Sequence, residues 1–229
     1  MKQDYDFIEI GTAFFDTLIE KANDEQYGLS IEPISEYLDK LPNKKNVTKI
    51  NGAVVADEDS NGLDVYYITE EVIDKYNLGI WMKGCNSIGK PHDFHIGYFH
   101  CPWTWHHHPD RKSLPTTNLF AMGLVTKKTI SCYTYKNLID AYNIGKVKEL
   151  KIDTEGYDCK ILNSVLKYYS NDPGMLPDLI SFESNAHSDS NEVAEITQKL
   201  INLGYHISYK EDGNVTEARI SNKMETGST

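Results

Sequence analysis

The chain has 229 residues, of which 40% are hydrophobic and 25% charged, and its 34 acidic side chains outnumber the 23 basic ones to give a formal net charge of −11. This composition is typical of a globular protein with a sizeable core, and the length fits one α/β domain. The acidic balance argues against broad, sequence-independent binding to nucleic acid or to an anionic membrane.

The cysteines and the apolar runs indicate the compartment. Cys85, Cys101, Cys132 and Cys159 form no Cys-x-x-Cys pair, so we expect reduced thiols. The start of the chain lacks a basic and apolar leader, and no apolar run approaches the roughly 20 residues that cross a bilayer. We therefore expect a soluble cytoplasmic protein that binds no membrane and ends in a flexible tail over residues 222–229.

The first quarter of the chain alternates short apolar runs with helical periods. The expected elements are a strand over 5–11, a helix over 14–22, a strand over 27–31 closed by Glu32-Pro33, a helix over 35–41 with Ser35 as its candidate cap, and strand character over 47–55.

The middle of the chain is less regular. The turn cluster at 57–62, followed by alternation over 63–68, predicts a hairpin. From residue 73 to residue 117 no period holds, and the stretch is rich in Gly, Pro, His and Trp. An irregular segment of this size inside a compact domain is typical of a functional loop, so we expect a lid there.

Regular order returns in the second half. The expected elements are strands over 129–133, 149–152 and 179–182, helices over 135–142, 158–169 and 192–203, and a closing antiparallel pair over 205–209 and 216–220. Repeated strand and helix units predict an α/β fold with a mainly parallel sheet and helices on both faces. We expect a single domain over residues 1–221 that carries the lid as an insert.

Polar residues follow the first two predicted strands, where open parallel sheets bind ligands. Gly11, in Glu9-Ile10-Gly11-Thr12, would let a ligand approach the backbone, and Glu32, about 20 residues later, is placed to bond two ribose hydroxyls. We therefore predict an adenosine-type cofactor site that includes Glu9, Gly11, Thr12 and Glu32. The full Gly-x-Gly-x-x-Gly pattern is absent, which counts against NAD or FAD. The structural alternative is that Gly11 only turns the chain and Glu32 only caps a helix.

A later strand delivers two carboxylates, Asp153 and Glu155, within Lys151-Ile152-Asp153-Thr154-Glu155-Gly156. These groups could bind a cation, accept the proton of a substrate hydroxyl, or hold the amino-acid end of the cofactor. The alternative is that they cap the helix that follows.

Three segments in this order resemble one family. Residues 151–156 are similar to the Lys-Ile-Asp-x-Glu-Gly core of FkbM-type methyltransferases, Ile31-Glu32-Pro33 resembles the Glu-Pro after their second strand, and Ile180-Ser181-Phe182-Glu183 resembles their late Ile-x-Phe-Glu strand. The resemblance implies a Rossmann-like class I methyltransferase fold that binds S-adenosylmethionine and methylates an oxygen, often a hydroxyl of a sugar or secondary metabolite. One motif departs: the family usually has Asp-x-Gly-Ala-Asn-x-Gly where this chain reads Glu9-Ile10-Gly11-Thr12-Ala13-Phe14-Phe15.

The leading hypothesis is therefore an O-methyltransferase in which Glu32 binds the ribose of S-adenosylmethionine and the region of Gly11 lies near its amino-acid end, with Asp153 as a further cofactor contact. The expected substrate is a small molecule or a glycan with a free hydroxyl. Asp153, Glu155 and His92 are the candidate catalytic groups, because each could accept the hydroxyl proton.

The lid supplies candidate substrate contacts. Asn86, Ser87 and His92 lie close together in the sequence and offer donors and acceptors to a polyhydroxylated substrate. The alternative for His92 is a solvated loop histidine.

The lid also carries a histidine-rich run, Trp103-Thr104-Trp105-His106-His107-His108-Pro109, with His95, His100 and Cys101 nearby. Its spacing does not match the patterns of zinc sites, so packing of the lid or contact with substrate is the favoured interpretation. No metal ligand is assigned, and a divalent metal is left open.

Two other functions compete with methyl transfer to a small molecule. The altered first motif would also fit a Rossmann-like binding module that has lost its cofactor. A nucleic-acid 2′-O-methyltransferase would share the fold, but the acidic balance counts against it.

Overall fold

The structure, a computed structural model, describes residues 1–12, 16–56, 62–76, 78, 80–96, 118–185, 188–210 and 214–220. The chain divides into two compact units. The first comprises residues 1–61 and 131–229, and the second comprises residues 62–130. The predicted single domain over 1–221 and the tail over 222–229 stay predictions, and the tail lies outside the described residues.

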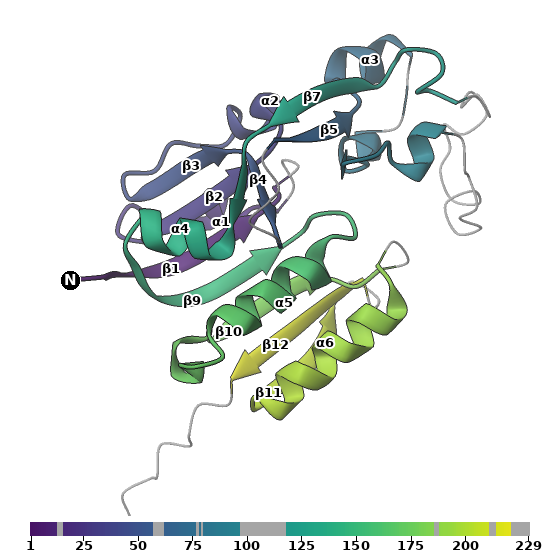
Figure 1. The fold of residues 1–229 in the computed structure, drawn as a ribbon. Helices are drawn as coiled ribbons and strands as arrows, with labels where there is room; N and C mark the ends of the chain where they lie inside the picture. The colour runs from purple at the N-terminus through teal and green to yellow at the C-terminus, as the bar shows by residue number, and fades with distance from the viewer. Residues whose placement is uncertain are drawn as a thin grey trace, which may run out of the picture. The chain divides into compact units, whose positions relative to one another are not determined.

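The first unit is built on a seven-stranded sheet with the order β11-β12-β10-β9-β1-β2-β3 (Figure 1). Neighbouring strands from β3 across to β10 run parallel, and β12 is antiparallel to both β10 and β11. The strands are β1 (Gln3–Ile10), β2 (Gly28–Glu32), β3 (Val47–Asn51), β9 (Ile144–Ile152), β10 (Leu179–Glu183), β11 (Tyr205–Lys210) and β12 (Val215–Ile220). The predicted mainly parallel sheet with an antiparallel C-terminal pair is confirmed.

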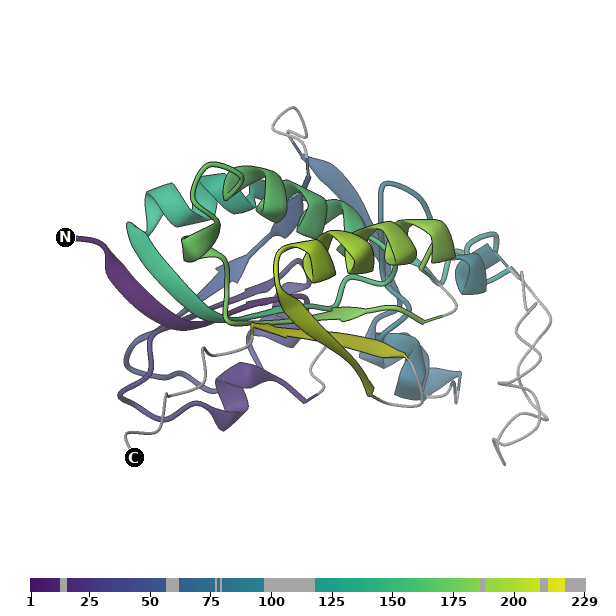
Figure 2. The same cartoon turned by 90° about the horizontal axis from the view of Figure 1, so that it is seen from below.

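Helices cover both faces of this sheet. The longer helices α4 (Tyr135–Ala141), α5 (Asp158–Tyr168) and α6 (Ser190–Asn202) lie on one face (Figure 2). On the other face, Phe7 of β1 packs with Ile19 of α1 (Leu18–Lys21) and Leu38 of α2 (Ser35–Leu38). A short 3₁₀ helix, η4 (Pro173–Met175), precedes β10. This arrangement is a Rossmann-like α/β fold, with helices on both faces of the sheet as predicted.

Apolar side chains on the faces of the central strands fix this architecture. All five residues of β2 are buried, as expected for an inner strand of a parallel sheet that is covered on both faces. In α5, Ile161, Leu162 and Val165 are fully buried against the sheet. Each such side chain contributes about 1.5–3 kcal/mol through burial.

Two predicted helices are shorter in the structure. The helix expected over 14–22 begins only at Leu18, where Thr17 caps it through a capping box with Glu20. Residues 13–15 lie outside the described residues. Ser35 is the first residue of α2 rather than its cap, so that prediction was wrong; the carboxylate of Glu32 accepts the Ile34 N–H instead, at 2.9 Å.

The predicted strand over 47–55 is interrupted at Gly52. A Cβ there would lie 2.6 Å from the ring of Tyr133 and 2.8 Å from the Ser131 carbonyl oxygen. After this break β4 (Ala53–Val55) pairs in parallel with β8 (Cys132–Thr134) as a separate two-stranded sheet. The predicted hairpin over 57–68 was therefore wrong, because the strand at 63–67 pairs elsewhere.

The second unit contains a three-stranded antiparallel sheet with the order β6-β5-β7. Its core consists of Ile68, Ile73, Leu78, Met82 and Leu119. Its elements are β5 (Leu63–Tyr67), α3 (Glu70–Lys75), η1 (Ile80–Lys83), β6 (Ser87–Ile88), η2 (Asp93–Ile96) and β7 (Thr126–Ile130). The stretch expected to be irregular thus holds short elements, and its part from 97 to 117 lies outside the described residues.

Two further expectations concern the compartment. Within the described part of the chain, no helix combines the length and apolarity needed to cross a membrane. Cys85, Cys132 and Cys159 form no disulfide, and Cys101 is not among the described residues.

Candidate functional site

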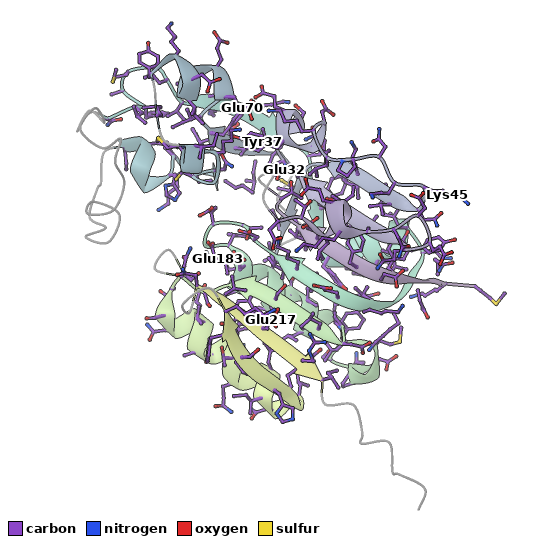
Figure 3. All side chains as sticks on the ribbon, turned by 180° about the vertical axis from the view of Figure 1, so that it is seen from behind. Glu32, Tyr37, Lys45, Glu70, Glu183 and Glu217 are labelled. Carbon is purple, nitrogen blue, oxygen red and sulfur yellow. The ribbon has the colours of Figure 1, made fainter. Side chains whose placement is uncertain are left out.

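Parallel strands of the first unit end at one edge of the sheet. Ile10 of β1 pairs with Ile31 of β2 and with Ile152 of β9, and Ile152 pairs with Phe182 of β10. The residues that follow these paired positions are therefore neighbours in a row: Glu32, Gly11, Asp153 and Glu183. Figure 3 labels Glu32 and Glu183 at the ends of their strands.

Gly11 holds the centre of this row. Its φ of 79° is in the left-handed region, and its N–H donates to the Ile31 carbonyl at 2.9 Å. The Asp153 N–H donates to the Ile10 carbonyl at 2.8 Å, which brings the end of β9 against the turn after β1. A Cβ on Gly11 would lie 1.8 Å from the Asp153 carbonyl oxygen, so no other residue fits here without movement.

Glu32 is 2% exposed, and its carboxylate fixes the turn after β1. One oxygen, Oε2, accepts the Thr12 N–H and the Thr12 hydroxyl, both at 2.9 Å, and Oε1 accepts the Ile34 N–H. Each carboxylate oxygen can accept more than one bond. Glu32 and Thr12 are therefore bonded to each other at the strand ends, and their contact with a cofactor stays a prediction.

Glu9 lies inside β1 and is fully buried. Its Oε1 accepts the N–H of Leu18, the first residue of α1, at 2.8 Å and lies 3.5 Å from Lys151 Nζ. Lys151 Nζ donates to the Asp16 carbonyl at 3.0 Å. Burial raises the pKa of Glu9, and the charge of Lys151 opposes this effect. Glu9 and Lys151 thus fix residues 16 and 18, where the turn after β1 leads into α1. A direct contact between Glu9 and the cofactor stays a prediction.

Three carboxylates meet beyond β9 and β10. One oxygen from each of Asp153, Glu155 and Glu183 lies within 4.8 Å of the other two. Burial, then the charges of Asp153 and Asp158, raise the pKa of Glu155 to about 8. Carboxylates this close can share a proton or bind a divalent cation.

Asp158, the first residue of α5, bonds to the two segments that carry this cluster. Its Oδ2 accepts the N–H of Thr154 at 3.2 Å and the hydroxyl of Thr154 at 2.7 Å, and its Oδ1 accepts the N–H of Glu183 at 3.1 Å. It is 1% exposed, and burial raises its pKa to about 6 although these bonds oppose the effect.

Comparison with known proteins decides the family. A family model described as the methyltransferase FkbM domain matches residues 8–207 of the 229. The chain belongs to the FkbM methyltransferase family. No curated protein and no solved structure gives a significant match.

The matched range of this FkbM methyltransferase includes every residue of the row at the strand ends. The departure from the family's first motif falls partly on residues 13–15, which are outside the described residues. The residues on either side of these three are held by hydrogen bonds. Thr12 donates to Glu32. Lys151 donates to the Asp16 carbonyl, and the Leu18 N–H donates to Glu9.

The predicted substrate contacts of this FkbM methyltransferase belong to the second unit. Asn86 Nδ2 donates to the Lys83 carbonyl at 2.5 Å, and the Ser87 hydroxyl donates to the Lys90 carbonyl at 2.7 Å. His92 is 9% exposed and its N–H donates to His95 Nδ1 at 3.2 Å, so it is not a solvated loop histidine. The convergence of Asn86, Ser87 and His92 with Asp153 stays a prediction.

His95, considered with the metal interpretation, is fully buried in the second unit. Burial, then the nearby His92, lowers its pKa to about 4. The rest of that interpretation, His100, Cys101 and the run over 103–109, lies outside the described residues.

Three residues beside the candidate site of this FkbM methyltransferase were not predicted from the sequence: Glu183, Asn51 and Asp158. Glu183 could have been found, because a carboxylate directly follows a predicted strand. Asn51 ends β3, and its Nδ2 donates to the carbonyls of Glu32 at 2.9 Å and Pro33 at 3.0 Å. The contacts of Asp158 carry no sequence signal beyond an acid in the first turn of a helix.

Proposed function

We propose that this methyltransferase uses S-adenosylmethionine and transfers its methyl group to a hydroxyl oxygen of a small molecule, a sugar or a glycan. The observation that carries the proposal is the row at the strand ends, in which a buried carboxylate, a left-handed glycine and a carboxylate cluster follow successive strands. In an open α/β sheet this edge is the ligand-binding edge.

The residues present fit the cofactor. Glu32 is a buried carboxylate at the end of β2, suited to two ribose hydroxyls, and Gly11 leaves the backbone after β1 free of a side chain that would obstruct the amino-acid end. When bound, S-adenosylmethionine supplies a methyl group on a positively charged sulfur. Asp153 stands next to Gly11 in the row, on the side away from Glu32, so its carboxylate is the further candidate contact for the amino-acid end of the cofactor.

The acceptor hydroxyl must lose a proton, and the carboxylate cluster supplies the group that takes it. Burial, then the charges of Asp153 and Asp158, raise the pKa of Glu155 to about 8, so below that pH Glu155 retains a proton and the pair carries the negative charge of Asp153. That charge can accept a hydrogen bond from the acceptor hydroxyl and then its proton.

The Glu32→Gln variant tests the cofactor site. We expect it to bind S-adenosylmethionine roughly tenfold or more weakly by calorimetry, because an amide cannot accept from all of its present partners and also from a ribose diol. The matched control is Glu36→Gln, an exposed acid on α2, which should bind as the wild type does. Circular dichroism checks that both variants fold. Equal affinity in Glu32→Gln and wild type would contradict the assignment.

A panel of hydroxylated acceptors, with release of S-adenosylhomocysteine as the readout, tests the reaction itself. Sugars and small alcohols should give turnover, and matched acceptors whose free hydroxyls are blocked should not. Asp153→Asn should lower the turnover number more than the cofactor affinity if Asp153 accepts the proton.

A further inference from the structure

We propose that Asp158 is a positioning residue that holds the loop carrying Asp153 and Glu155 against the end of β10, where Glu183 lies. The inference rests on the proposed function, because it concerns the same carboxylates. It adds a residue that contacts the row at the strand ends only through the backbone N–H of Glu183, and that holds the acids of the carboxylate cluster in place.

The hydrogen bonds of Asp158 differ from those of an ordinary helix cap. A capping acid bonds to N–H groups of its own helix, as Asp189 does at the start of α6 with Asn191 at 2.8 Å and Glu192 at 3.2 Å. Asp158 instead directs both oxygens away from α5. Its Oδ2 bonds to the backbone and hydroxyl of Thr154, and its Oδ1 bonds to the backbone of Glu183.

These bonds join two segments that are distant in the sequence. Thr154 lies between Asp153 and Glu155, and Glu183 is the last residue of β10. One buried carboxylate therefore ties the loop after β9 to the strand beside it. We therefore expect the hydrogen bonds of Asp158 to set the distances between the carboxylates of Asp153, Glu155 and Glu183.

The backbone of the loop needs such a tie. Glu155 has a φ of 54°, a conformation that residues other than glycine seldom adopt, and Gly156 follows with a φ of 93°. The surroundings must hold Glu155 in this conformation, and the bonds from Thr154 to Asp158 begin one residue before it. The charge of Asp158 also contributes to the raised pKa of Glu155.

The variant Asp158→Asn, compared with Asp189→Asn, tests the proposal. The amide at 158 can accept from Thr154 or from Glu183 but presents an NH₂ group to the other, and it removes a negative charge beside Glu155. We expect the pKa of Glu155, followed by carbon-13 NMR of its labelled carboxyl, to fall in Asp158→Asn. We also expect the turnover number to drop roughly tenfold or more, with a smaller change in the affinity for S-adenosylmethionine.

Asp189→Asn removes a helix-capping carboxylate without touching the site, so it should leave the titration of Glu155 and the turnover unchanged. An unaltered Glu155 titration and a turnover within twofold of wild type in Asp158→Asn would overturn the proposal. The NMR titration needs no activity, so a wild-type protein that neither binds S-adenosylmethionine nor turns over would refute the proposed function while the titration still reports on Asp158.

A second pair of variants covers the case in which Asp158→Asn does not fold. Thr154→Val removes the shorter bond to Asp158, at 2.7 Å, but keeps every charge, whereas Thr154→Ser keeps the hydroxyl. We expect Thr154→Val to lower the turnover number and to alter the Glu155 titration, and Thr154→Ser to restore both. Equal behaviour of the two variants would count against the tie.

Discussion

Burial and the carboxylates of Asp153 and Asp158 raise the pKa of Glu155 to about 8, from 4.5. The folded protein therefore binds this proton more tightly than the unfolded chain. The stabilisation that the proton gives is fully present below about pH 4.5 and is lost as the pH rises through about 8.

We predict that Glu155→Gln removes this part of the pH dependence. Between pH 5 and pH 9 the free energy of unfolding of the wild type should fall relative to that of Glu155→Gln, measured by urea denaturation at each pH. Glu195→Gln, an exposed acid on α6, is the control and should follow the wild type. Parallel curves for wild type and Glu155→Gln would refute the raised pKa.

Gly11 offers a test of close packing at a single residue. Gly11→Ala should lower the free energy of unfolding by about 1–3 kcal/mol or more, because the new Cβ meets the Asp153 carbonyl and because φ is positive. Gly204→Ala separates the two causes, since Gly204 has a φ of 90° with no neighbouring atom within 4 Å of its added Cβ. Equal losses in the two variants, by urea denaturation, would show that the contact with Asp153 has no effect of its own.

Residue positions in the row were predictable from the sequence, whereas some contacts were not. Gly11, Glu32 and Asp153 each follow an apolar run, and the carboxyl ends of parallel strands share an edge. The direction of the Asp158 carboxylate depends on the N–H of Glu183, 25 residues away, so local pattern does not indicate it. The role of Glu9 at the start of α1 is hidden for the same reason.

At the scale of elements, η2 of the second unit depends on a neutral histidine. The N–H of His92 donates to Nδ1 of His95, and the carbonyl of His95 accepts the N–H of Phe120 at 2.9 Å. Burial, then His92, lowers the pKa of His95 to about 4. Protonation removes the acceptor and places a charge in a buried position, so the stability that neutral His95 gives is present above about pH 6.5 and is lost as the pH falls through about 4.

We predict that the second unit loosens in acid because of His95. Nitrogen-15 NMR spectra recorded from pH 7 to pH 4 should show the amide signals of His92 and Phe120 leaving their native positions as the pH falls. In His95→Gln this change should disappear or shift, whereas His206→Gln, on an exposed position of β11, should behave as the wild type does. The same acid transition in all three proteins would exclude His95 as its cause.

Elements with a clear period were predicted well, and tertiary pairing explains the errors. The predictions for α5 and α6 fall within a few residues of the observed helices, because each has a consistent apolar face. The strand character over 47–55 was real, but Gly52 divides it because β4 pairs with β8, some 80 residues later. Turn residues at 57–62 suggested a local hairpin that long-range pairing overrides.

At the scale of the whole molecule, the order of strands and helices in the chain was enough to predict the sheet. Strand and helix units in succession leave few arrangements, since crossovers between parallel strands are right-handed and helices must cover both faces. The division into two units was not apparent, because the strands that bound the second unit pair with each other across the least regular stretch of the sequence.

Binding of S-adenosylmethionine should stabilise the molecule as a whole. At a concentration one hundredfold above its dissociation constant, a ligand that binds only the folded state adds about 2.7 kcal/mol to the free energy of unfolding. Thermal unfolding with and without S-adenosylmethionine or S-adenosylhomocysteine should therefore show a higher melting temperature with either. ATP, which shares the adenosine but lacks the amino-acid end, is the control. No shift with any of them would favour a binding module that has lost the cofactor.

The first and last strands of the second unit, β5 and β7, pair with each other. Leu63, near its start, pairs with Ile130 at its end, so the chain leaves and re-enters through two adjacent strands about 5 Å apart. Because its two ends are adjacent, this segment can be exchanged between relatives without changing the path of the chain through the sheet that carries Gly11, Glu32 and Asp153. Grafting residues 62–130 from one family member into another would therefore test the proposal that the second unit contacts the acceptor, with the range of acceptors methylated as the readout.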